Sequence, residues 1–160
     1  LCGFNKTRVS ENDIMRKKYG FSGEPKIGEK VICLKNNKNK AVFNGMIGKI
    51  DDIKVDRELK NGDFLYFVKI TFENSVYYGR CLASQFSSEK TLTSEAYGLK
   101  EEVGFIPDLF DFGYVISVHK SQGSEYRSVI VNVQKAPIWD QKQWEYTAAT
   151  RAVQQLYFVY

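Results

Sequence analysis

Four short runs rich in β-branched and aromatic residues constrain the fold of this chain more than any other feature. They lie between residues 30 and 82 and read KVICLKN, GMIGKIDDI, DFLYFVKITF and SVYYGRCL. Tight turns separate them, among them Asn-Gly at 44–45 and Asn-Gly-Asp at 61–63. Short strands joined by such turns pair with their neighbours in antiparallel fashion. The pattern of strands and turns in residues 30–82 therefore predicts a small antiparallel β-barrel.

The segment before this region has the pattern of a helix. Residues 5–20, NKTRVSENDIMRKKYG, carry basic residues in the last turn and a glycine, Gly20, that ends the helix. We expect Val9, Ile14 and Met15 on its buried face. The residues LCGF before the helix look like the end of a strand.

The last third of the chain returns to long apolar runs. YVISV and SVIVNV are continuous apolar segments, as in parallel sheets that are covered on both faces. Between SVIVNV and the closing run QLYFVY lies DQKQWEYTAATRAV, a helical pattern that Asp140 is placed to cap. Strands that alternate with helices predict an α/β layer. We therefore expect an α/β domain that is formed by the two ends of the chain and interrupted by the β-rich insertion.

The composition supports a packed core, because 43% of the residues are hydrophobic and 14% are aromatic. The charge is uneven along the chain. Residues 1–50 hold 11 Lys and Arg against 4 Asp and Glu, a net of +7, so a total of +4 leaves −3 for the remaining 110 residues. A basic first third suits a polyanionic partner, and a solvated lysine-rich face explains it equally well.

The cysteines indicate the compartment that we expect. Cys2, Cys33 and Cys81 are odd in number and widely spaced, and a single histidine cannot complete a common zinc site. We expect reduced core thiols in a cytoplasmic protein that binds no metal through these residues. No apolar run approaches the roughly 20 residues that cross a bilayer, and no signal peptide is visible. The chain begins without an initiator Met, so we expect a piece of a longer protein.

The polar turn HKSQGSE, residues 119–125, directly follows the expected strand YVISV. Ligands of open α/β sheets bind at the carboxyl ends of the strands, which is where this turn lies. Gly123 permits close approach of the backbone, and His119 and Lys120 add donors for phosphate oxygens. Glu125 is an acceptor suited to a sugar hydroxyl. The turn therefore suits a nucleotide or a nucleic-acid backbone, although a polar connection between two strands accounts for it as well.

A second unusual segment is TAATRA, residues 147–152. Small residues at Ala148, Ala149 and Ala152 allow this helix to pack closely on a sheet. Arg151 either pairs with an internal carboxylate or points into an interface toward a phosphate. The spacing alone favours the internal pair.

Together, the two segments resemble motifs V and VI of superfamily-one DNA helicases. HKSQGSE after an apolar strand and YTAATRA before a final strand stand in the family's order, about 30 residues apart. The similarity is nearest to the RecD/Dda-like branch, which has a UvrD/Rep-type C-terminal helicase domain and moves 5′ to 3′. LCGFNKTRVSENDIMR resembles the opening strand and helix of the second motor domain. KIGEKVICLKNNKNKAVFNGMIGKI resembles the start of its SH3-like insertion.

The resemblance implies a fold and a role for each matching residue. The fold is α/β, with a RecA-like parallel-sheet domain (residues 1–25 and 101–160) interrupted by a small SH3-like antiparallel β-barrel (residues 26–100). Arg151 would be the arginine finger on the γ-phosphate of ATP. The other implied roles are ATP binding by Gly123, Glu125 and Arg8, DNA binding by Ser117, His119 and Lys120, and coupling by Gln122 and Thr150. Ser117 stands where the family often has Thr, which keeps the hydroxyl.

The implied function is the C-terminal part of an ATP-dependent DNA helicase that couples ATP hydrolysis to translocation on single-stranded DNA. ATP with Mg²⁺ is the implied cofactor, and the Mg²⁺ ligands would lie on a missing N-terminal motor domain of the same chain. No G-x-x-x-x-G-K-[ST] phosphate loop occurs, and Asp51-Asp52 lacks the setting of a metal-binding acidic pair. We therefore expect the isolated chain neither to hydrolyse ATP nor to unwind DNA.

Two other functions stay open at this point. A non-enzymatic nucleic-acid-binding module would use the barrel and the basic first third, and a nucleotide-binding regulator would use HKSQGSE alone. The loop with Lys35, Lys38 and Lys40 either contacts a phosphate backbone or is simply solvated. Aromatic residues in strands usually pack rather than stack on bases. We expect packing roles for Tyr66, Phe67, Tyr77, Tyr78, Trp139 and Trp144.

Overall fold

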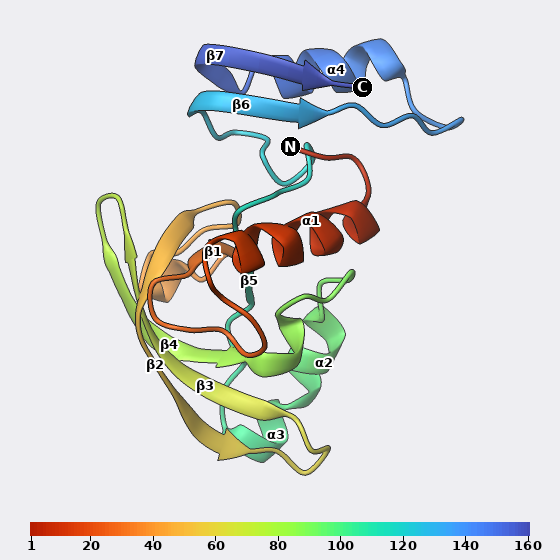
Figure 1. Cartoon of the computed structure of the whole chain (residues 1–160). Coiled ribbons are helices and arrows are strands. Elements are labelled where there is room, and N and C mark those ends of the chain that lie inside the picture. Colours follow the sequence, from red (N-terminus) through yellow and green to blue (C-terminus); the bar gives the residue numbers. More distant parts are fainter. The chain divides into compact units, whose positions relative to one another are not determined.

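The computed structural model describes all 160 residues, which fold into two compact units (Figure 1). Unit 1 contains residues 1–11 and 115–160, and unit 2 contains residues 12–114. Helix α1, Asn5–Lys18, begins in unit 1 and ends in unit 2. The functional domain boundaries that we expect near residues 25 and 100 stay a prediction.

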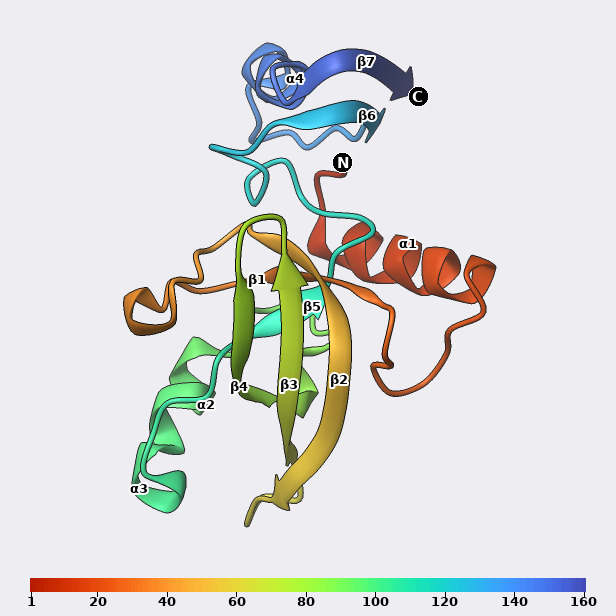
Figure 2. The same ribbon diagram turned by 90° about the vertical axis from the view of Figure 1, so that its left-hand side faces the viewer.

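Unit 2 is built on a five-stranded antiparallel sheet with the order β4-β3-β2-β1-β5 (Figure 2). The strands are β1 (Lys30–Cys33), β2 (Ile47–Glu58), β3 (Phe64–Phe72), β4 (Val76–Leu82) and β5 (Phe110–Phe112). The four strands expected between residues 30 and 82 are confirmed. Hairpin turns join β2 to β3 and β3 to β4, as the Asn- and Gly-containing breaks predicted.

One residue brings the two edges of this sheet together. Asp108, which precedes β5, forms an isolated parallel bridge with Cys81 of β4. Its N–H donates to the Arg80 carbonyl at 2.9 Å, and its carbonyl accepts from the Leu82 N–H at 3.3 Å. Because β5 pairs with β1 at the other edge, this segment closes the sheet on itself, as a barrel requires. That the insertion is SH3-like stays a prediction.

The core of unit 2 lies inside the closed sheet and includes Val31, Ile50, Val68, Ile70 and Phe110. A second cluster forms where two short helices, α2 (Thr93–Gly98) and α3 (Lys100–Val103), cover one end. Two 3₁₀ helices complete the unit, Lys38–Lys40 and Ala83–Gln85. The sequence did not predict these helices, because their apolar residues are too few to show a period.

The cysteines and aromatic residues largely follow the sequence prediction. All three cysteines are buried and none forms a disulfide, which confirms their interpretation as core thiols. Tyr66 and Tyr77 are buried, with 6% and 1% exposed, and pack in the barrel core. The packing prediction is wrong for Tyr78, which is 57% exposed. Successive residues of a strand face opposite sides, so Tyr78 faces outward when Tyr77 faces inward.

Unit 1 contains a parallel pair of strands with a crossover helix. The elements are β6 (Tyr126–Asn132), α4 (Gln141–Ala149) and β7 (Ala152–Val159). Asp140 caps α4 by accepting a hydrogen bond from the Gln143 N–H at 3.0 Å, as predicted. Val129, Val131, Trp144 and Ala148 form the centre of its core.

The prediction of a strand at YVISV is wrong. Residues 114–118 bend and turn, and a single parallel bridge joins Ser117 to Cys2. The Cys2 N–H donates to the Ile116 carbonyl at 3.1 Å, and the Val118 N–H donates to the Cys2 carbonyl at 2.9 Å. The pairing between these two segments cannot extend into a longer strand ladder, because the extended residues LCGF end where α1 begins, at Asn5. The parallel sheet of unit 1 is therefore limited to β6 and β7.

The buried face of α1 also differs from the prediction. Ile14 is 55% exposed, and Val9 and Met15 are only partly buried. The deeply buried residues are instead Arg8, Asn12 and Arg16, spaced four apart. Arg16 is held by a carboxylate that is distant in sequence, so the local apolar pattern could not reveal this face. The glycine stop is confirmed, since Gly20 has a φ of 81° just after the helix.

Candidate functional site

Residues 117–125 of unit 1 form a compact turn that its own backbone holds together. The Ser121 N–H donates to the Ser117 carbonyl at 3.1 Å, and the Ser124 N–H donates to the Ser121 carbonyl at 3.0 Å. Ser121 is fully buried, and its hydroxyl donates to the Val118 carbonyl at 2.7 Å. The turn is therefore fixed at its base, while its later residues face solvent.

The predicted contact residues of this turn differ in their exposure. His119, Gln122, Gly123 and Glu125 are exposed. Gly123 has a φ of 81°, and nothing lies within 4 Å of where a Cβ would be, so its backbone angle rather than close approach accounts for the glycine. Ser117 is 5% exposed, and its hydroxyl accepts from the Lys120 N–H at 3.4 Å.

Arg151 joins the end of α4 to this turn. Its Nη1 donates to the Ser124 carbonyl at 3.1 Å, and its Nε donates to the Thr147 carbonyl at 3.1 Å. Its Nη2 donates to the Thr150 hydroxyl at 3.0 Å. All three acceptors are neutral, and no ion pair involves Arg151. The internal carboxylate partner that the spacing favoured is therefore absent, and the guanidinium keeps an uncompensated charge.

Arg8, like Ser117, is buried in unit 1. It is 7% exposed, so little of its side chain is accessible to a ligand. Burial raises the pKa of the Cys2 thiol to about 11. The positive charge of Arg8 opposes that rise, because it favours the thiolate. The structure thus brings Arg151 to the 117–125 turn, while an ATP contact by Arg8 stays a prediction.

A sequence model of the UvrD-like helicase C-terminal domain matches residues 112–159, which include both the turn and Arg151. The match covers less than half of the chain. The resemblance to superfamily-one helicases that the two motifs carry is thereby confirmed for this part of the chain.

The fold of the whole chain is similar to that of part of two solved helicases. The Pif1 helicase from Candida albicans matches with a TM-score of 0.52 and 19% identity over 99% of this chain and 44% of that one. The Bacteroides Pif1 bound to single-stranded DNA matches with a TM-score of 0.52 and 16% identity over 99% of this chain and 39% of that one. The similarity to RecD-like helicases is therefore confirmed as a likeness of fold.

An uncharacterized protein of Methanocaldococcus jannaschii is 29% identical over 154 residues, which is 87% of this chain and 11% of that protein. The chain thus spans about a tenth of this curated relative and less than half of either helicase structure.

A pocket of about 280 Å³ opens beside the 117–125 turn. His119 and Gln122 line it on one side, and Gln143, Trp144 and Thr147 of α4 line it on another. Sequence reasoning missed this pocket because it treated both tryptophans as packing residues. The available signal was the position of Trp144 between the two motifs, on the helix that ends just before Arg151.

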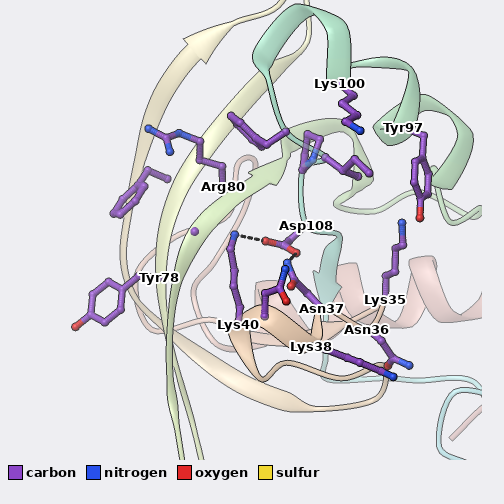
Figure 3. Close-up of a pocket in the computed structure, with 16 residues that line it drawn as sticks. Lys35, Asn36, Asn37, Lys38, Lys40, Tyr78, Arg80, Tyr97, Lys100 and Asp108 are labelled. Carbon is purple, nitrogen blue, oxygen red and sulfur yellow. Dashed lines mark hydrogen bonds and ion pairs between the residues drawn. The ribbon is translucent and has the colours of Figure 1, made fainter.

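A larger groove of about 750 Å³ lies in unit 2 (Figure 3). It is lined by five cationic side chains and one anionic side chain, Lys35, Lys38, Lys40, Arg80, Lys100 and Asp108. Four aromatic residues also line it, Phe67, Tyr78, Tyr97 and Phe105. The sequence identified the basic loop, but not the cations of β4 and α3 that complete the groove.

The single acid of the groove is already neutralised. Asp108 accepts hydrogen bonds from Lys40 at 2.6 Å and from Asn37 at 2.8 Å (Figure 3). It also accepts a hydrogen bond from the Tyr77 hydroxyl at 2.5 Å. Burial, reinforced by Asp108, raises the pKa of Tyr77 far above its usual range, so this phenol stays a donor. Lys40 is paired with Asp108, and Arg80 is paired with Asp56, so the surplus positive charge of the groove comes from Lys35, Lys38 and Lys100.

Cationic side chains lie close to the aromatic rings of the groove. Lys35 Nζ lies 3.6 Å from the centre of the Tyr97 ring, in view in Figure 3. Arg80 lies near the Phe67 and Phe105 rings, 5.8 and 5.5 Å from their centres. Arg80 also donates to Asp56 at 2.8 Å and holds the pKa of that carboxyl below its usual range. Lysines interleaved with rings suit a ligand that has both phosphates and bases.

Other classes of site find no support in the side chains. No group of three or more His, Cys, Asp or Glu residues gathers where it could hold a metal ion. No helix has both the length and the apolar character that crossing a membrane requires.

Proposed function

We propose that this chain is the C-terminal part of an ATP-dependent DNA helicase that couples ATP hydrolysis to movement along single-stranded DNA. The observation that carries the proposal is the position of Arg151. Arg151 is partly exposed, and its guanidinium is bonded only to neutral oxygens and is joined to the 117–125 turn. An uncompensated arginine at the edge of a domain is what an ATP site shared between two domains needs.

The chemistry follows from the charge that develops as the γ-phosphate leaves. An arginine finger that meets this charge is worth about 10³–10⁵ in rate. Arg151 supplies the finger, and Thr150 orients it through the bond from Nη2 to its hydroxyl. Gly123 and Glu125 lie at the nucleotide edge, and Arg8 supports the same region. ATP is bound with Mg²⁺, whose ligands lie on an N-terminal motor domain outside residues 1–160.

The turn links hydrolysis to the nucleic acid. His119 and Lys120 contact the phosphate backbone of single-stranded DNA, and the buried Ser117 holds the turn that presents them. Gln122 couples the turn to the other motor domain. A shift of Arg151 toward the γ-phosphate pulls on the Ser124 carbonyl, which lies five residues after His119. Closing the ATP site and adjusting the grip on DNA are then one event.

The test replaces Arg151 with alanine in a protein that joins this chain to its N-terminal motor domain. We expect DNA-stimulated ATP hydrolysis to fall by a factor of about 10³ or more, while the affinity for single-stranded DNA changes by less than about threefold. Arg127→Ala is the matched control, because Arg127 is an exposed arginine of β6 that bonds only Gln154. Hydrolysis that survives in the Arg151→Ala protein overturns the finger assignment.

A second candidate function rests on the groove of unit 2. Its cations and rings suit a non-enzymatic module that binds single-stranded nucleic acid. In that case the isolated chain binds an oligonucleotide tightly, and Lys35→Gln, Lys38→Gln and Lys100→Gln together reduce both the affinity and its salt dependence. Lys18→Gln and Lys142→Gln are matched controls on exposed helix positions. Weak binding without sequence preference favours the helicase function instead.

A further inference from the structure

We infer that the pocket beside the 117–125 turn binds one unstacked base of the single strand, and that Trp144 provides a hydrogen bond to it. This inference rests on the proposed function, in which the same turn contacts the DNA backbone. It assigns a base-binding role to Trp144, Gln122 and Gln143, none of which the helicase motifs identify as a base contact.

The strongest observation is an unpartnered donor. Trp144 is 6% exposed, and its Nε1 is shielded from solvent and has no hydrogen-bond partner. An indole nitrogen can only donate, and buried donors nearly always have an acceptor. Trp144 lines the pocket, but its Nε1 is closed to solvent, so a carbonyl oxygen or a ring nitrogen of a ligand reaches this donor only when neighbouring side chains move aside. Nucleobases carry both kinds of acceptor on their edges.

The ring of Trp144 is also held in place. Trp139 stacks on Trp144 with ring centres 5.7 Å apart and an angle of 8° between the planes. Phe4 stacks on the other side of Trp139, with centres 4.8 Å apart. A ring that is held in one orientation presents its N–H donor in one direction, as recognition of a planar ligand requires.

The remaining lining suits the same ligand. The side-chain amides of Gln122 and Gln143 make no hydrogen bond within the protein, although both line the pocket. Such amides can pair with base edges through both a donor and an acceptor. Ile138 is 91% exposed, which leaves an apolar side chain free to cover a base from the solvent side.

The size and location of the pocket limit the ligand further. At about 280 Å³ it is smaller than the range of roughly 300–1,000 Å³ that is usual for drug-sized molecules, so it suits one base rather than a whole nucleotide chain. His119 both lines the pocket and is exposed on the turn. A base in the pocket therefore leaves its phosphate near the residue that we propose for backbone contact.

The two tryptophans of the pocket are the only ones in the sequence, so their emission reports on this site alone. The experiment titrates the 160-residue chain at low salt with a labelled oligothymidylate, and separately with an abasic oligomer of the same length. Anisotropy of the label measures binding, and tryptophan emission measures occupancy of the pocket. We expect both oligomers to bind, and only the oligomer with bases to shift the emission wavelength or lower its intensity.

A conservative variant checks the hydrogen bond itself. Trp144→Phe keeps an aromatic ring and removes the donor, and we expect oligothymidylate binding to weaken roughly two- to tenfold, with abasic binding unchanged. Tyr146→Phe is the matched control, since it removes one hydroxyl from an α4 residue that is 70% exposed. Gln143→Ala, on the exposed side of α4, provides a second variant if Trp144→Phe does not fold.

The outcomes separate this inference from the proposed function. Binding by anisotropy with unchanged tryptophan emission overturns the base pocket and leaves the DNA contact intact. Equal emission changes with both oligomers also overturn it, because the backbone alone would then occupy the site. Absence of any binding overturns the DNA contact of the turn, and the base pocket with it.

Discussion

The guanidinium of Arg151 and the backbone carbonyl of Ser124 are joined by a hydrogen bond of 3.1 Å. This bond connects the residue just after α4 to the 117–125 turn, across 27 residues of sequence. No carboxylate competes for the guanidinium, so its charge is left for a ligand. The same residue can therefore hold the turn in place and respond to a phosphate.

Loss of this bond should loosen the turn in the isolated chain. We expect Arg151→Ala to speed amide hydrogen exchange in residues 119–125 by about tenfold, because it removes three hydrogen bonds from a charged donor. Hydrogen exchange followed by mass spectrometry provides the measurement. Arg127→Ala should leave exchange in these residues unchanged, and an equal increase in the two variants would mean that Arg151 does not hold the turn.

The buried pair of Arg16 and Glu29 should dominate the stability of unit 2. Arg16 Nε lies 2.6 Å from Glu29 Oε1, its Nη2 lies 2.9 Å from Oε2, and its guanidinium covers the Phe112 ring at 3.7 Å. Glu29→Ala leaves a buried charge without its partner, so we expect a loss of about 3–5 kcal/mol in the free energy of unfolding, measured in urea.

The exposed pair of Lys17 and Asp13 on the same helix serves as the control for that measurement. Lys17→Ala should lower the free energy of unfolding by less than about 0.5 kcal/mol. Similar losses in Glu29→Ala and Lys17→Ala would contradict the importance of the buried pair.

Asp108 should be needed to close the barrel. It accepts hydrogen bonds from three side chains, and its backbone joins β4 to the segment before β5. Asp108→Ala removes the acceptor of the buried Tyr77 hydroxyl, and we expect a loss of about 2–4 kcal/mol, measured by urea unfolding. Asp56→Ala breaks the partly exposed ion pairs with Arg80 and Arg57 and should cost about 1 kcal/mol or less. Comparable losses would show that the Asp108 network does not close the barrel.

The stability of unit 1 should fall at alkaline pH. Burial raises the pKa of Cys2 from its ordinary value of 9.0 to about 11. The folded state therefore favours the neutral thiol, and this contribution is complete below about pH 9 and is lost as pH rises through about 11. We expect the loss to amount to about 1–2 kcal/mol between these limits.

Urea unfolding at pH 8 and pH 11 measures this loss, and Cys2→Ala isolates the thiol from other groups that titrate in the same range. The variant should lose less stability than the unaltered chain over this interval. An identical loss in both proteins would mean that Cys2 does not contribute.

Features that depend on neighbouring residues could be read from the sequence. The four strands of unit 2, the stop at Gly20 and the cap at Asp140 follow from local patterns of apolar residues, turns and caps. The roles of Arg151 and the turn came from resemblance, and the spacing alone favoured a carboxylate partner that the structure does not contain.

Features that depend on distant partners could not be read in this way. The polar face of α1 is buried because Glu29 and Phe112 meet Arg16, and no local period reveals such partners. YVISV is apolar enough for a strand, but the extended segment that it pairs with, LCGF, ends where α1 begins. The groove of unit 2 combines cations from a loop, a strand and a helix, so only the folded chain shows that they face one cavity.

The most direct test of the central claim compares two ligands in a protein that joins this chain to its N-terminal motor domain. ADP with aluminium fluoride and Mg²⁺ mimics the departing γ-phosphate, whereas ADP alone does not. If Arg151 meets the charge of the transition state, Arg151→Ala should weaken binding of the mimic by about 10³ or more and change binding of ADP by less than about threefold. Equal weakening for both ligands, or none for the mimic, would contradict the account.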